Sequence, residues 1–71
     1  MEAAMTHGTV VKIQRLLQRG VIRGDDGRRR AFRRRAMVKY LEFLDIRVGD
    51  RVRFDEEGEW AINVERVLSK R

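Results

Sequence analysis

The chain has 71 residues, no cysteine, one histidine and a formal net charge of +6. This length allows one domain, and the lack of cysteine excludes a disulfide framework and a thiolate metal site. A single histidine excludes a histidine-based metal cluster, and no apolar run reaches the roughly 20 residues of a membrane-spanning helix. We therefore expect a soluble, cytoplasmic protein with no metal, no other cofactor and no membrane contact.

The charge is distributed unevenly along the chain. Residues 12–39 contain 11 basic residues and two acids, a net charge of +9, whereas residues 40–65 contain three basic residues and eight acids, a net charge of −5. Most of the basic residues are arginines, whose planar guanidinium group binds phosphate and stacks on nucleobases. A clustered basic segment is typical of nucleic-acid-binding domains, although an arginine-rich surface also solubilises a small domain.

The first elements in chain order are an arm and three strands. Residues 1–7 carry no pattern and are expected to form a flexible N-terminal arm. Residues 8–17 are rich in apolar and β-branched residues, which predicts a strand. The Asp-Asp-Gly sequence at 25–27 predicts a turn, because glycine supplies positive φ and aspartate bonds its own backbone. Strands are expected on both sides of this turn, at 19–23 and 29–35.

The segment after the third strand is ambiguous. Four apolar residues recur at the spacing of one helical face: Met37, Tyr40, Leu41 and Leu44. This spacing predicts a short helix at about residues 37–44. One longer basic helix is the alternative, because no glycine or proline interrupts residues 28–48.

The last predicted unit is a hairpin. Val52 and Phe54 alternate with arginines, which predicts a strand. The Asp-Glu-Glu-Gly-Glu segment at 55–59 predicts a solvated turn, since its spacing does not match a calcium loop. Three apolar residues then alternate with Ala61, Asn63 and Glu65, which predicts a second strand: Trp60, Ile62 and Val64. We expect Trp60 to pack in the core or at the barrel edge.

Three strands, a helix and two strands are the element order of an oligonucleotide-binding (OB) barrel. The expected fold class is therefore all-β: a five-stranded antiparallel OB-fold barrel over residues 8–71, with the short helix between strands three and four. We expect Tyr40 and Phe43 of this helix to cap the barrel. In this architecture strands two and three face the ligand, and both are predicted within the segment of net charge +9.

The order of short motifs resembles the framework of the cold-shock domain family over about residues 8–66. The motifs that carry this resemblance are Gly-Thr-Val (8–10), Gly-Val-Ile (20–22), Asp-Asp-Gly (25–27), Ala-Phe (31–32), Val-Gly-Asp-Arg-Val-Arg-Phe (48–54) and Ala-Ile-Asn-Val (61–64). The resemblance implies a barrel that binds single-stranded RNA or DNA, often melting its structure as a chaperone.

Most of the aromatic residues that stack on bases in cold-shock domains are replaced in this chain. Alignment on the Asp-Asp-Gly motif places Lys12 and Ile13 at two aromatic positions of the first strand. It places Arg19 and Val21 at two phenylalanine positions of the second strand.

The family's second base-binding motif aligns with residues 31–35, where only Phe32 is aromatic. In that alignment Arg33 takes a position that points inward, and Phe32 is either a stacking residue or a core residue. Because stacking on an aromatic ring contributes roughly 1–3 kcal/mol per base, we expect weak sequence preference and a binding energy that depends on arginine and on salt.

The basic segment and this alignment together define the candidate nucleic-acid-binding residues: Lys12, Arg15, Arg19, Val21, Arg28, Arg29, Arg30, Phe32, Arg33, Arg34 and Arg35.

Three functions remain open at this point. The first is binding of single-stranded RNA or DNA by a monomer. The second follows from a resemblance to bacterial translation initiation factor one, in length, in Gly-Thr-Val near the start, in the short helix and in Val-Gly-Asp-Arg-Val (48–52), which implies ribosomal RNA as the partner. The third is a module that docks an acidic protein. We expect no enzyme and no catalytic residue, since the chain has no Ser-His-Asp set and no glycine-rich phosphate loop, and His7 has no visible partner.

Overall fold

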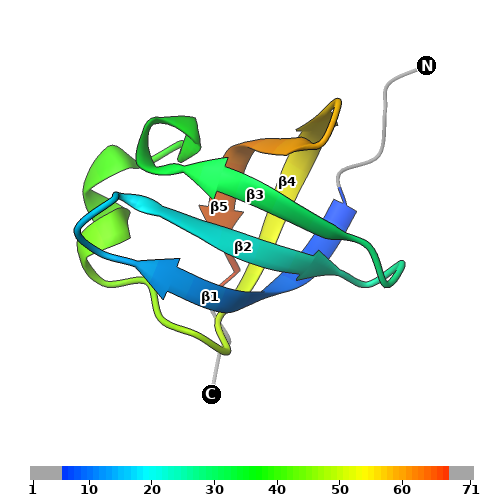
Figure 1. Ribbon diagram of the computed structural model, residues 1–71, viewed down its shortest axis with the longest axis horizontal. Coiled ribbons are helices and arrows are strands. Elements are labelled where there is room, and N and C mark those ends of the chain that lie inside the picture. Colours follow the sequence, from blue (N-terminus) through cyan, green and yellow to red (C-terminus); the bar gives the residue numbers. More distant parts are fainter. Residues whose placement is uncertain (1–5, 68–71) are drawn as a thin grey trace.

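The structure, a computed structural model, describes residues 6–67 as five strands and two short 3₁₀ segments. In chain order these are β1 (Thr6–Gln14), β2 (Arg19–Gly24), β3 (Arg29–Arg33), η1 (Arg34–Ala36), η2 (Tyr40–Leu44), β4 (Arg51–Glu57) and β5 (Trp60–Arg66). The strands form a closed barrel in the order β1-β2-β3-β5-β4 (Figure 1). The predicted all-β class and OB-like barrel are confirmed. None of the described helical segments is long and apolar enough to cross a bilayer.

The long first strand closes one side of the barrel, because it pairs antiparallel with both β2 and β4. Its register against β2 shifts between Val10 and Lys12, and a bulge of this kind bends a strand so that it can serve two neighbours. Thr6 and His7 already pair with β4, so β1 begins inside the segment expected to form an arm. The rest of that predicted arm, residues 1–5, lies outside the described residues.

The opposite side of the barrel closes through a short parallel seam between β3 and β5. The strand ladder contains one pair, Ala31 with Trp60. Beyond the end of β3, Met37 forms an isolated bridge with Val64, and the Val38 N–H donates to the Val64 carbonyl at 2.8 Å. The barrel is therefore not antiparallel throughout, and side chains of η1 and β5 meet where the ladder is absent.

Ten apolar residues fill the barrel with side chains that are at most 5% exposed: Val10, Ile22, Phe32, Met37, Phe43, Ile46, Val52, Phe54, Ala61 and Val64. Phe32 and Phe43 meet edge to face with their ring centroids 6.4 Å apart, so the segment after β3 packs onto the strands through aromatic contact. All three phenylalanines of the chain lie in this core.

The α-helix expected at about 37–44 does not form, and 3₁₀ turns take its place. Met37 and Lys39 have extended backbones, with ψ of 138° and 97°, because Met37 is drawn into the barrel wall by its bridge to Val64. Only the five residues Tyr40–Leu44 remain for η2, and Phe43 is the buried one. The predicted helical face was wrong beyond Met37, since three of its members are 50–69% exposed: Tyr40, Leu41 and Leu44.

The regular alternation expected for β5 is interrupted. Ala61 and Val64 face the core, whereas Trp60 is 38% exposed. The cause is Asn63, whose positive φ of 52° accompanies a register shift opposite Arg53 and Asp55. One extra residue in β5 at this bulge reverses which side of the strand faces the interior.

The third strand ends two residues before its predicted end. Arg34 and Arg35 belong to η1, not to a strand that runs to residue 35. Phe32 is fully buried and Arg33 is exposed, the reverse of the directions that the cold-shock alignment implies. Shifting that alignment by one residue on β3 would place Phe32 at an inward position, with Ala31 and Arg33 on the outer face.

The close approach of β2 to its neighbours gives a test of this packing. A Cβ atom at Gly20 would lie 2.6 Å from the Lys12 carbonyl oxygen and 2.8 Å from Phe32 Cε1. We expect Gly20→Ala to lower the free energy of unfolding by about 1–3 kcal/mol, because β1 or the core must shift. Urea denaturation measures this, with exposed Arg29→Ala as a control that should change stability by no more than about 0.5 kcal/mol. An unchanged midpoint for Gly20→Ala would contradict the packing.

Candidate nucleic-acid interface

The outer face of β1, β2 and β3 carries basic side chains around a stripe of smaller apolar ones. Lys12 pairs with Val21, Val21 with Ala31, and Ala31 with Trp60 across the seam. Residues paired in a ladder project to the same side of a sheet, so these four side chains form one row. Arg19 pairs with Arg33 in an adjacent row.

Two hollows open beside these rows. The first has a volume of about 480 Å³ and lies between η1 and β5, where Arg35, Met37, Trp60 and Asn63 contribute to its lining. The second, of about 320 Å³, lies between the β1–β2 turn and η2, where Leu17, Gln18, Arg19 and Tyr40 contribute.

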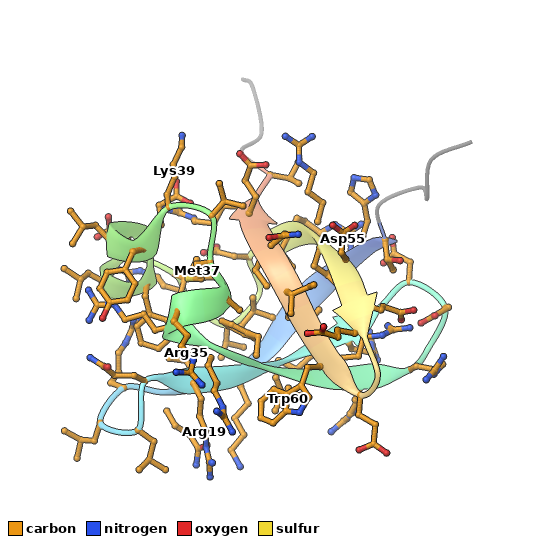
Figure 2. All side chains as sticks on the ribbon, turned by 90° about the horizontal axis from the view of Figure 1, so that it is seen from above. Arg19, Arg35, Met37, Lys39, Asp55 and Trp60 are labelled. Atoms are coloured by element: carbon orange, nitrogen blue, oxygen red, sulfur yellow. The ribbon has the colours of Figure 1, made fainter. Side chains whose placement is uncertain are left out.

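Arg33 and Arg35 line both hollows, so the two hollows are adjacent. We call the two together the arginine groove and define it by Arg19, Arg33, Arg34, Arg35, Tyr40 and Trp60. Figure 2 shows Arg19, Arg35 and Trp60 on the same side of the barrel, and Lys39 and Asp55 on the opposite side. The groove therefore joins the end of the β2–β3 sheet to the start of β5.

Two arginines of the groove lie over aromatic rings. The Arg33 guanidinium carbon is 4.4 Å from the centroid of Trp60, and that of Arg34 is 4.1 Å from the centroid of Tyr40. Arg34 Nε also donates to the Tyr40 carbonyl oxygen at 3.3 Å. Attraction between cation and ring orders these guanidinium groups, while Trp60 and Tyr40 remain 38% and 50% exposed.

No arginine of the groove forms an ion pair within the described part of the chain. Ion pairs there involve four other arginines: Arg30, Arg51, Arg53 and Arg66. Arg19 donates from Nε to the neutral Gln14 side chain at 3.1 Å. Clustered charge of one sign in a depression attracts a polyanion more strongly than the same charge spread over the surface.

The two acids of the Asp-Asp-Gly turn form ion pairs with arginines of β3 and β4. Asp26 accepts from Arg30 Nη2 at 2.7 Å and from the Arg28 backbone N–H at 3.0 Å. These two hydrogen bonds lower the pKa of Asp26 to about 2, and the bond from Arg30 has the larger effect. Asp25 accepts two hydrogen bonds from Arg51 of β4, at 2.8 and 2.9 Å. These bonds are the largest cause of the lowered pKa of Asp25.

Three of the predicted binding residues have structural roles instead. Phe32 is 0% exposed, so of the two roles left open for it the structure shows the core residue, and its place among the predicted binding residues was wrong. Arg30 is 3% exposed and contacts both Asp26 and Glu56. These contacts raise the pKa of Arg30, and the hydrogen bond to Asp26 is the largest cause. Neither side chain is available to a phosphate or a base.

Arg15 is the third of these residues. It donates from Nη1 to the Phe43 carbonyl oxygen at 2.5 Å and from Nη2 to the Ile46 carbonyl oxygen. It thus connects the β1–β2 turn to η2 and to Ile46 beyond its end.

The other predicted residues divide into two places. Arg19, Arg33, Arg34 and Arg35 meet in the groove, and Lys12 and Val21 lie on the adjoining outer face. Arg28 and Arg29 are exposed but lie near the β2–β3 turn, at the end of that hairpin away from η1 and η2 (Figure 1). The structure therefore does not bring these two arginines to the groove.

Sequence reasoning missed the two aromatic residues of the groove. Trp60 was expected to pack in the core or at the barrel edge and not to contact a ligand, and Tyr40 was expected to cap the barrel. The available signal was Asn63, because asparagine is enriched at positive φ and a bulge there turns Trp60 outward. No comparable signal places Tyr40 beside Arg34.

Comparison with known proteins finds no family model that matches the chain and no curated sequence that matches it. Among residues 6–67 no three histidine or acidic side chains are grouped as metal ligands would be. The fold and the groove together define a small OB-like barrel with a basic depression that contains two partly exposed aromatic rings.

The low pKa of Asp26 predicts how acid affects the fold. The folded value of about 2 lies below the unfolded value of 3.8, so the ionised group stabilises the fold above 3.8, and this contribution is lost as the pH falls through about 2. We expect the stability difference between the parent and Asp26→Asn to be largest above about pH 4 and to shrink on acidification. Urea denaturation at several pH values measures it, with exposed Asp45→Asn as the control. A difference independent of pH would contradict the Asp26–Arg30 interaction.

Proposed function

We propose that this protein binds single-stranded nucleic acid, RNA or DNA, in the arginine groove and on the adjoining outer face of β1, β2 and β3. The observation that carries the proposal is the meeting of four arginines without acidic partners, in the described chain, beside the exposed rings of Trp60 and Tyr40. Proteins that bind single strands combine a basic groove that follows the backbone with aromatic rings on which bases stack.

The aromatic rings favour a single strand over a duplex. Trp60 and Tyr40 lie within a depression lined by Arg33 and Arg35, so a base reaches either ring only when it is turned out of its own stack. Bases in a duplex are stacked and paired, whereas those of a single strand are free to turn outward. Because only two rings are available, phosphate contacts supply most of the expected binding energy, and sequence preference is weak.

The salt dependence of oligonucleotide binding tests this function. Each phosphate contact on a single strand contributes about −0.7 to the slope of log K against log salt concentration. We expect Arg19→Ala/Arg35→Ala to weaken binding and to reduce the magnitude of that slope by about 1.4, because two contacts are removed. Fluorescence anisotropy of a labelled single-stranded oligonucleotide, titrated at several salt concentrations, measures both quantities.

A matched control removes the same charge elsewhere. Arg47→Ala/Arg53→Ala also deletes two positive charges, but these residues line neither hollow. We expect its slope to stay close to that of the parent. Equal effects of the two double variants would mean that net charge, and not the groove, attracts the oligonucleotide. Absence of binding by the parent at low salt would overturn the proposed function.

A second candidate function, docking of an acidic protein, is favoured by exposed apolar side chains at one end of the barrel. Leu16, Leu17, Leu41 and Leu44 are 58–99% exposed, where Arg15 holds the β1–β2 turn against η2. Exposed apolar residues beside basic charge suit a partner with apolar and acidic side chains.

The variant Leu16→Ser/Leu41→Ser distinguishes the two functions, since neither residue lines the groove. If the groove binds nucleic acid, the affinity for an oligonucleotide should equal that of the parent in the same anisotropy titration. A large loss of oligonucleotide affinity would place the contact surface at this apolar end of the barrel and contradict the assignment of the groove.

A further inference from the structure

The hollow between η1 and β5 contains one acidic side chain among its arginines. Glu57 contributes to the lining together with Arg33, Arg35 and Trp60. It pairs with Trp60 in the β4–β5 ladder, so the two side chains project to the same side of the sheet. Among the described residues Glu57 forms no ion pair, in contrast to Glu56 and Glu65 on the same hairpin.

A free carboxylate in a basic groove has a physical consequence for a bound strand. It repels phosphate, so the phosphates of a strand in this hollow lie toward Arg33 and Arg35. The same carboxylate accepts hydrogen bonds strongly, and the edge of a base carries N–H donors, which a deoxyribose within a strand lacks. The base is therefore directed toward Glu57 and its phosphate away from it.

A second acceptor lies in the same hollow. The Asn63 side chain donates from Nδ2 to Asp55 Oδ2 at 3.0 Å, which fixes the orientation of the amide and leaves its carbonyl oxygen as an acceptor. Asn63 belongs to the lining of the hollow. The carbonyl oxygen of Asn63 thus adds an acceptor to the carboxylate of Glu57.

The dimensions and the stacking surface suit one base. The volume of about 480 Å³ lies within the range of small-ligand sites. Trp60 supplies a ring that is 38% exposed and already stacks with the Arg33 guanidinium at 4.4 Å. A base can lie against this pair, with its ring stacked and its edge turned toward the acceptors.

We propose that this hollow is a subsite for a single unstacked base that carries an exocyclic amino group, with Trp60 as the stacking surface and Glu57 as the acceptor. This inference rests on the proposed function. It predicts that cytosine is preferred over uracil, since the two rings have the same size but cytosine presents an amino donor where uracil presents a carbonyl oxygen.

The matched ligands for the test are hexamers of deoxycytidine and deoxyuridine, which carry the same backbone charge. We expect the parent to bind the cytosine hexamer about fivefold or more tightly, from the discrimination of at least about 1 kcal/mol that a base-edge contact supplies. In Glu57→Gln the side-chain amide can donate to uracil, so the ratio should fall toward one while binding of the uracil hexamer strengthens. Anisotropy titrations at one low salt concentration measure both ratios.

Trp60 provides a direct readout because it is the only tryptophan of the chain. We expect the cytosine hexamer to quench its fluorescence, and Trp60→Ala to weaken binding by roughly 5- to 150-fold, the effect of losing one stacked base. Trp60→Phe keeps a stacking ring and should retain most of the affinity. Comparison of the parent and Trp60→Phe does not depend on whether the alanine variant folds.

The outcomes separate this subsite from the wider function. Three results would each overturn the subsite: equal affinities of the parent for the two hexamers, an affinity ratio unaffected by Glu57→Gln, or unquenched Trp60 fluorescence at saturation. The proposed function would still stand if the parent bound both hexamers in a salt-dependent way. Failure of the parent to bind either hexamer would overturn both.

Discussion

The buried guanidinium of Arg30 is the interaction on which the arrangement of charge in this barrel depends. It lies in the wall of the barrel, contacts Asp26 and Glu56, and stands over the ring of Phe54 with its carbon 5.3 Å from the centroid. The β2–β3 turn, β3 and β4 are thereby joined through one side chain. A buried charge of this kind is stable only while its partners remain, because an uncompensated buried ion costs several kcal/mol.

This arrangement also determines which arginines remain free. The acids of the turn are engaged by Arg30 and by Arg51, so they do not neutralise the other end of the β2–β3 hairpin. There the chain leaves the sheet through η1, and Arg33 and Arg35 stand between two hollows. The acids of the turn, Asp25 and Asp26, are thus paired at one end of the hairpin, while the arginines at its other end form no ion pair in the described chain.

Much of the fold was predictable, since it depends on local patterns. Apolar alternation and the Asp-Asp-Gly turn indicated the strands and their order. The errors arose where one residue breaks a local pattern. Asn63 adds a residue to β5 and reverses its faces, and the bridge of Met37 to Val64 prevents the helix that the spacing after it indicates. Neither effect is visible until the strands are placed beside one another.

The candidate groove was predictable only in part, for a related reason. The arginines of residues 33–35 were identified from charge, which is a property of the sequence alone. Arg30 was misassigned because burial, and not charge, decides its role. Trp60 was missed because its place beside Arg33 depends on the seam between two strands that are distant in the chain and share a single ladder pair. The pairing of two strands that are distant in the chain, such as β3 with β5, has no local sequence signal.

The bulge at Asn63 has a consequence for how such a surface can arise. Along a regular strand every second side chain points outward, so the total number of residues between two fixed points decides whether a given ring faces solvent or the core. In β5 that number is altered at one left-handed residue, downstream of Trp60. Removal of the extra residue at this position would exchange the inward and outward side chains of β5 before the bulge, so that Trp60 would turn toward the core while the amino acids of the groove stay the same. Among barrels of this kind, the insertion or deletion of one residue in a strand can therefore create or remove a stacking surface with almost no change in composition or charge.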